Sequence, residues 1–332
     1  MPSYEPGPAR HTTAPHPQPT PYLHLLRTPT YGWWKSLLGL LLAGATWLFL
    51  SVVLIVVTII VTGGGDGGRS FLDDLAGDPL GSPTALLIVN LNLAALIPSV
   101  WVAVLAVHQE RLGWVSSVAR RLRWRLLLGF GGVATVLLGF GLLLGYLIVD
   151  PVGGTGATSY DGGFVAGMLA VVLLTTPLQA AGEEYLFRGY LSQVIAGWIP
   201  ARLAGAIVAA AVTGLLFALA HGSQDLPTFA SRLAFGLTAS LAVYLTGGLE
   251  AAIAYHTMNN VLLFLLALVA GPNLEVEVSS SALLVVELLV MAGFVGSVLW
   301  WSRRGSVQRT TTVADADRAA EGTRLGHLVG VG

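Results

Sequence analysis

A small set of ionisable and amide side chains interrupts an otherwise apolar chain in three separate segments. They are Glu183, Glu184, Arg188, His221, His256 and Asn260. A carboxylate can take a proton from water, an imidazole can assist that step or bind a metal, and His and Asn can donate to a developing oxyanion. As a set, these residue types suit hydrolysis.

Helical spacing indicates how the two acids divide their roles. Glu184 and Arg188 are four residues apart, so on a helix they stack as an internal ion pair. Glu183 is rotated by about 100° from Glu184. One acid is therefore neutralised locally while the other points elsewhere and is available for chemistry.

The other two segments carry complementary groups. His256 and Asn260 are also four apart and present an imidazole and an amide on one helix face. Phe217 lies one helical turn before His221, and we expect its ring to line the pocket around that histidine.

Each of these features taken alone has a purely structural explanation. Glu184 with Arg188 is an ordinary ion pair. A histidine at a helix end, such as His221, often lies at the membrane interface. Asn260 alone would hydrogen-bond to a neighbouring helix. Only the three segments together favour a catalytic interpretation.

Further polar or small residues in apolar segments are expected to have packing roles. We expect Glu287 to snorkel or to hydrogen-bond to a neighbour, Asn90 and Asn92 to make packing contacts, and Gly141 with Gly145 to form a helix-packing surface.

Composition limits the class of protein that must position these groups. Of 332 residues, 54% are hydrophobic and 11% are charged, whereas a soluble domain has about 25% charged residues. The net charge of −1 indicates no nucleic-acid partner. Cysteine is absent, which excludes disulfides, thiolate metal sites and a Cys nucleophile. The sequence also lacks the His-Glu-x-x-His motif, the Gly-x-Ser-x-Gly elbow and the P-loop.

Long apolar runs predict an all-α, polytopic integral membrane bundle of about eight transmembrane helices. The expected spans are Ser36–Thr62, Thr84–Val107, Leu126–Val149, Phe164–Gly182 with an extension, Leu203–Ala220, Phe229–Thr246, Ala251–Ala270 and Ala282–Trp301. With both termini cytoplasmic, the inner segments hold eleven Lys and Arg residues and the outer loops only Arg69 and Arg232. This split predicts a multi-pass protein of the cell membrane with both ends inside.

The two ends have a different composition from the core. Residues 1–30 hold eight of the sixteen prolines and are expected to be a disordered tail. The transmembrane domain is expected over 31–301, and a second disordered, cytoplasmic tail over 302–332.

Three motifs in chain order resemble the CPBP family, which contains CAAX prenyl proteases of the Ras-converting type and the bacterial bacteriocin-processing or "Abi" relatives. The motifs are Glu183-Glu184-x-x-x-Arg188, Phe217-x-x-x-His221 and His256-x-x-x-Asn260, within about residues 164–270. The resemblance implies an intramembrane endopeptidase acting on a protein or peptide substrate, which in eukaryotic relatives is prenylated. The Arg- and Ala-rich composition favours a bacterial source.

The resemblance also implies a role for each motif residue. Glu183 would activate water, and Glu184 would support it and pair with Arg188. His221 would position the water, and His256 with Asn260 would stabilise the oxyanion. Relatives have been described both as metalloproteases and as metal-free glutamate proteases, so zinc held by Glu183, His221 and His256 stays open.

Helix depth raises a difficulty for this site. Glu183 lies 19 residues after Phe164, about 28 Å along a helix and near the inner face, whereas His221 would end its span near the outer face. A break at Pro177 and an amphipathic or re-entrant helix over Leu191–Trp198 would shift the fifth span. We therefore predict irregular helices around a water-filled cavity.

Two other functions remain open at this stage. One is a non-enzymatic membrane protein of the same fold, such as an immunity or adaptor protein. The other is a transporter whose buried Glu relays protons.

Overall fold

The computed structural model describes residues 16, 18–77, 79–149, 160–270, 281–304 and 307–312. Within these ranges the chain is helical and forms no β-strand. Eight helical segments are long and apolar enough to cross a membrane, in the order expected from the sequence. The predicted all-α, polytopic helical bundle is confirmed.

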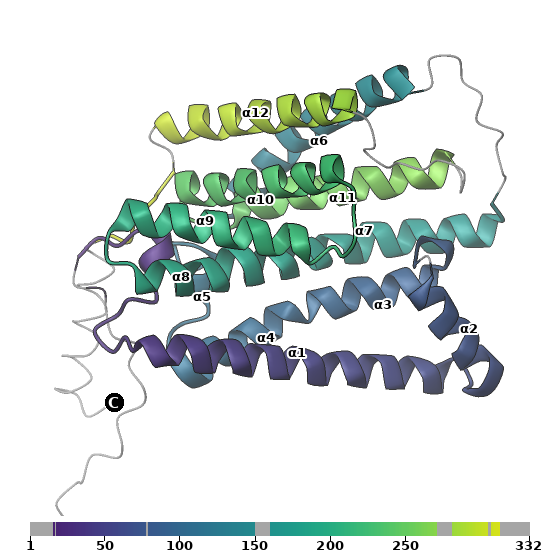
Figure 1. The fold of residues 1–332 in the computed structure, drawn as a ribbon, viewed down its shortest axis with the longest axis horizontal. Helices are drawn as coiled ribbons and strands as arrows, with labels where there is room; N and C mark the ends of the chain where they lie inside the picture. Colours follow the sequence, from purple (N-terminus) through teal and green to yellow (C-terminus); the bar gives the residue numbers. More distant parts are fainter. Residues whose placement is uncertain are drawn as a thin grey trace, which may run out of the picture.

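Most of the long helices run along the long axis of the molecule, whereas the shorter α2 runs steeply across it (Figure 1). In chain order the α-helices of the described residues are α1 (Trp33–Val61), α2 (Gly65–Ala76), α3 (Pro83–Ala94), α4 (Leu96–Ala103), α5 (Gly113–Ser116), α6 (Trp124–Val149), α7 (Gly162–Glu184), α8 (Ser192–Trp198), α9 (Arg202–Leu219), α10 (Leu226–Thr246), α11 (Glu250–Ala270) and α12 (Ser281–Arg303). Short 3₁₀ turns are η1 (Tyr22–His24) and η2 (Pro79–Gly81), and π-helical segments are η3 (Val104–His108) and η4 (Tyr185–Leu191).

Capping residues fix where several of these helices begin and end. Ser82, Asp161 and Asp225 precede α3, α7 and α10, and each side-chain oxygen accepts a hydrogen bond from a first-turn N–H. α10 ends at Gly247, whose φ of 67° is the left-handed conformation that a glycine adopts without steric cost.

Close backbone contacts bring the central helices together. α7 packs against α3 and α11, and α9 packs against α10. A Cβ on Gly182 of α7 would lie 2.1 Å from the carbonyl oxygen of Leu93 in α3, and one on Gly236 of α10 would lie 2.8 Å from Cα of Gly214 in α9. Only glycine permits these two approaches, which set the walls around the end of α7.

The fourth span differs from the expected one. α7, η4 and α8 form one continuous helical segment from Gly162 to Trp198, with Pro177 accommodated inside α7. Leu191–Trp198 is thus the end of this span and no re-entrant element. The expected irregularity occurs instead as the π-helical η4, which begins directly after Glu184.

This continuity removes the depth difficulty. Glu184 lies 14 residues before Trp198, about 21 Å along the helix, and His221 lies 19 residues after Arg202, about 28 Å. Both distances are measured from the short turn between α8 and α9, so Glu184 and His221 lie at similar depth. Figure 1 shows the α9–α10 connection ending part-way along α7, while α7 and α11 continue beyond it.

Parts of both expected tails pack against the bundle. Tyr22, Leu23, Leu25 and Leu26 are buried in the main core. The N- and C-terminal segments meet in an antiparallel bridge between Pro21 and Thr310. Disorder over residues 18–30 and 307–312 was therefore wrong, because the apolar side chains of the first segment have a core to enter. The expectation for residues 1–15, 17 and 313–332 lies outside the described residues.

Candidate active site

The end of α7 brings the first motif to the centre of the bundle. Glu183 and Glu184 are the last residues of α7, and Arg188 lies in η4. Glu184 and Arg188 are both fully buried, and Arg188 Nη1 lies 2.8 Å from Glu184 Oε1. The predicted ion pair is present, and its burial makes it sensitive to the loss of either partner.

His256 of α11 joins the two acids. Its Nδ1 lies 2.8 Å from Glu184 Oε1, and its Nε2 lies 3.4 Å from Glu183 Oε2. An ionised carboxylate only accepts hydrogen bonds, so the Glu184 contact holds the proton on Nδ1 and turns Nε2 towards Glu183. The result is a connected series from Arg188 through Glu184 and His256 to Glu183.

Asn260 reaches the same group of residues through Gln179, which the sequence interpretation did not include. Asn260 Nδ2 donates to Gln179 Oε1 at 3.0 Å, and Gln179 Nε2 donates to Glu183 Oε2. The missed signal was the spacing, since Gln179 lies four residues before Glu183.

Aromatic rings form one wall of the site. The Phe217 ring lies 5.6 Å from the His256 ring and 5.5 Å from that of Phe235, and the Arg188 guanidinium lies 4.3 Å from the Phe217 centroid. The face of an aromatic ring attracts a cation at this distance. Phe217 therefore makes a cation–π contact with Arg188 and also packs against the rings of His221 and His256.

His221 lies at the exposed rim of the site, beyond Phe217. Its ring is 4.8 Å from that of Phe217, and its Nδ1 lies 2.8 Å from the Phe217 carbonyl oxygen. A carbonyl only accepts, so Nδ1 carries the proton and Nε2 is an acceptor in the neutral ring. Desolvation lowers the pKa of His221, although the hydrogen bond to the Phe217 carbonyl acts in the opposite direction, and this favours the neutral ring. No contact joins His221 to Glu183 in the described part of the chain.

Residues predicted to be structural have packing contacts. Ser231 donates to Glu287, and Asn90 donates to Thr175 and Thr176 at 2.8 and 3.1 Å. The backbone oxygen of Asn92 accepts from the Trp47 indole. A Cβ on Gly141 would lie 2.6 Å from Val290, and one on Gly145 would lie 3.3 Å from Leu283, so both glycines face α12.

The three residues considered as zinc ligands do not form a metal site. Among the described residues, no three His, Asp or Glu side chains are grouped to hold an ion. Both ring nitrogens of His256 face carboxylates, and Nδ1 of His221 faces a backbone carbonyl. The three side chains are thus not grouped as zinc ligands in the described part of the chain, and a role for zinc stays a prediction.

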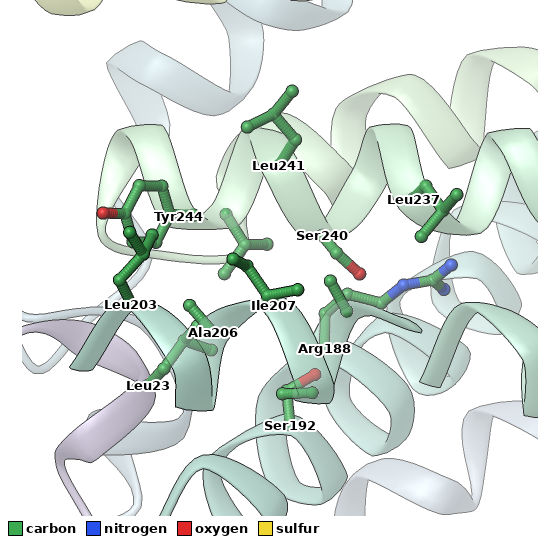
Figure 2. A pocket seen from close by; sticks show the side chains of 13 residues that line it. Leu23, Arg188, Ser192, Leu203, Ala206, Ile207, Leu237, Ser240, Leu241 and Tyr244 are labelled. Carbon is green, nitrogen blue, oxygen red and sulfur yellow. The ribbon is translucent and has the colours of Figure 1, made fainter. Parts of the chain in front are cut away.

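A cavity of about 170 Å³ lies beside the buried ion pair, between α9 and α10. Its walls are mostly aliphatic, and its polar groups include Ser192, Ser240 and Arg188. Figure 2 shows the aliphatic stem of Arg188 along this cavity, with the guanidinium directed away towards Leu237. The cavity is thus next to the ion pair and is not lined by Glu183.

Comparison with known proteins identifies the segment that holds the site. Residues 165–262 match the family model described as type II CAAX prenyl endopeptidase Rce1-like. A curated relative is the uncharacterized protein YyaK of Bacillus subtilis (strain 168), which is 25% identical over 169 residues. The alignment covers 50% of this chain and 56% of YyaK, so the chain spans about half the length of that relative. No solved structure matches the chain.

All three motifs lie inside the matched segment. Glu183 and Glu184 end α7, His221 follows α9, and His256 and Asn260 lie on α11. The resemblance predicted from the motifs is confirmed: residues 165–262, which contain all three motifs, match the Rce1-like family of type II CAAX prenyl endopeptidases.

Proposed function

We propose that this chain is an intramembrane endopeptidase that hydrolyses peptide bonds with water activated by Glu183. The observation that carries the proposal is the buried series Arg188–Glu184–His256–Glu183, with separations of 2.8, 2.8 and 3.4 Å. Ionisable groups inside membrane spans are costly and mark functional sites by default. The Rce1-like domain supports a protease rather than another use of these groups.

In the proposed first step, Glu183 takes a proton from water while the water oxygen bonds to the substrate carbonyl carbon. The carbonyl π electrons move to its oxygen, which becomes an oxyanion. Glu183 Oε2 lies 3.4 Å from His256 Nε2, so we assign proton uptake to Oε2, from which the proton can reach that nitrogen without rotation of the carboxyl group. A positioned general base of this kind contributes about 10²- to 10⁴-fold to the rate.

In the second step, His256 and Asn260 act on the developing charge. The proton passes from Glu183 to His256 Nε2, and the resulting imidazolium donates to the oxyanion together with an N–H of Asn260. The C–N bond then breaks, the carbonyl re-forms, and His256 returns the proton to the leaving nitrogen. Glu184 stabilises the imidazolium through Nδ1, and Arg188 stabilises Glu184.

We propose a supporting role for His221 at the rim. Its neutral ring has an acceptor at Nε2, which can hold a water molecule entering from the exposed side. Phe217 separates this position from His256, so His221 would guide water rather than transfer the proton.

The substrate class follows from the family and the surroundings. We propose a protein or peptide substrate that reaches the site from the membrane, with lipidated proteins among its substrates and membrane lipid as its environment. The family description names CAAX prenyl endopeptidases, which supports testing a prenylated peptide first.

The test uses purified protein in liposomes with two quenched probes, an S-farnesylated CAAX peptide and a single-span peptide. Glu183→Gln and His256→Ala should each lower kcat/KM by about 10²-fold or more. Glu287→Gln is the matched control, because Glu287 is a second intramembrane acid that bonds to Ser231 outside the site. It should stay within about threefold of wild type.

Three outcomes would refute the proposal. Undiminished cleavage in both site variants would refute the mechanism. Glu183-dependent proton flux without cleavage would support a transporter, and a folded wild type with neither activity would support a non-enzymatic member of the fold.

A further inference from the structure

Gln179 is a buried amide in the middle of an apolar helix, and the chemistry proposed above does not use it. It lies one turn before Glu183 on α7 and is 6% exposed. A buried amide costs free energy unless its donor and its acceptor are both satisfied. Its hydrogen bonds therefore reveal what the site requires of this position.

Both ends of the Gln179 amide bond to groups assigned to catalysis. Nε2 donates to Glu183 Oε2, and Oε1 accepts from Asn260 Nδ2 at 3.0 Å. A carboxylate offers only acceptors and an amide nitrogen only donors. A primary amide is the neutral side chain that can donate to the first and accept from the second over this span.

The Gln179 bond limits the rotation of the Glu183 carboxylate. Gln179 and His256 both contact Oε2, at the same carboxylate oxygen. Because Gln179 Nε2 donates to Oε2, the carboxylate keeps one direction, with Oε2 beside His256 Nε2. A base that is oriented before water arrives loses less entropy when the reaction begins.

The same bond determines which end of the Asn260 amide faces α7. Asn260 Oδ1 accepts from Asn259 Nδ2 at 3.1 Å, while Asn260 Nδ2 donates to Gln179. A flipped amide would lose both hydrogen bonds. One N–H of Asn260 is used by Gln179, so the second N–H is the one available to an oxyanion.

From this arrangement we infer that Gln179 is a positioning residue of the hydrolytic site, orienting the Glu183 base and the Asn260 oxyanion donor together. The inference rests on the proposed function. Through its two hydrogen bonds, Gln179 fixes how α7 and α11 face each other at the site. Proton uptake by Glu183 and charge stabilisation by Asn260 both depend on that alignment.

A merely structural amide would behave differently, and the chain offers a matched control. Gln193 of α8 is a fully buried glutamine whose Nε2 donates to the Trp114 carbonyl oxygen at 3.0 Å, away from Glu183. Gln179→Met and Gln193→Met remove the same group from two buried sites. Both should lower the thermal midpoint, but only the first should affect the chemical step.

The expected result for Gln179→Met is a fall in kcat of about 10- to 100-fold, the range for leaving buried polar partners unsatisfied. Its KM should change by less than about threefold, because substrate contacts remain. Gln193→Met, measured per folded molecule, should keep both constants within about threefold. Equal kcat for Gln179→Met and wild type, or equal losses in the two variants, would overturn the inference.

A double-mutant cycle with Asn260→Ala tests the route of the effect. If Gln179 acts partly through Asn260, adding Gln179→Met to Asn260→Ala should reduce kcat by a smaller factor than in the wild type. Strictly multiplicative losses would overturn that route. Glu183→Gln in the same assay separates the two proposals. If it is inactive while Gln179→Met is normal, only the inference fails; if it is active or if the wild type cleaves neither probe, both fail.

Discussion

Replacing Arg188 by methionine should separate the fold of the site from its chemistry. Arg188 and Glu184 are fully buried and 2.8 Å apart, which corresponds to an attraction of about 6 kcal/mol at an effective dielectric constant of 20. Removing one partner of a buried pair typically costs about 3–5 kcal/mol, because the other charge stays behind without compensation. We expect Arg188→Met to lose about this much free energy of unfolding.

The double variant Glu184→Gln with Arg188→Met should recover most of that loss, since it leaves no buried unpaired charge. Its activity should stay low. A glutamine can present an N–H to His256 Nδ1 and so reverse the tautomer that turns Nε2 towards Glu183. In a serine protease triad the corresponding change lowers kcat by about 10⁴-fold, and we expect at least 10²-fold here.

The assay combines denaturant unfolding in detergent with cleavage of the quenched probes per folded molecule. Arg123→Met is the matched control. Arg123 forms another ion pair, at 2.7 Å, with the buried Glu250, which is 127 residues away in the sequence. It should be destabilised to a similar degree while retaining activity. An Arg188→Met variant within about 1 kcal/mol of wild type would refute the charge argument. A fully active double variant would refute the role of Glu184.

Two further predictions concern stability. Glu110 is 3% exposed, and burial raises its pKa from 4.5 to about 7. The folded state therefore holds a proton that the unfolded state releases across that window, and stability falls as pH rises through it. Glu110→Gln should match wild type at pH 4 and exceed it by up to about 3 kcal/mol at pH 8 in denaturant unfolding; an equal difference at both pH values would contradict this. Gly182→Ala should cost at least 1–3 kcal/mol and lower activity, because its Cβ would meet the Leu93 backbone at 2.1 Å. Gly131→Ala, with nothing within 4 Å of its Cβ, should be neutral or stabilising in the same thermal scan.

The class of fold was predictable because hydrophobic length alone determines which segments can cross a bilayer. The Glu184–Arg188 pair was predictable for a similarly local reason, since four-residue spacing on a helix brings side chains together. The contacts of His256 with Glu184 and Glu183 join positions 72 and 73 residues apart, and no spacing rule predicts them. The packed part of the N-terminal segment was missed because prolines outweighed the signal of Tyr22, Leu23, Leu25 and Leu26.

The depth of the site could not be predicted, and the reason lies in Arg188. A charged residue after an apolar run normally marks the end of a span, so the extension of the fourth span beyond Gly182 was predicted without a defined end. In the fold, Glu184 neutralises Arg188 inside the bundle, and the helix continues through η4 and α8 to Trp198. The same pairing that lets the helix continue moves both acids away from the membrane surface, to the level of His221. Span length and catalytic geometry thus depend on one buried ion pair, whose effect appears only when the tertiary contacts are known.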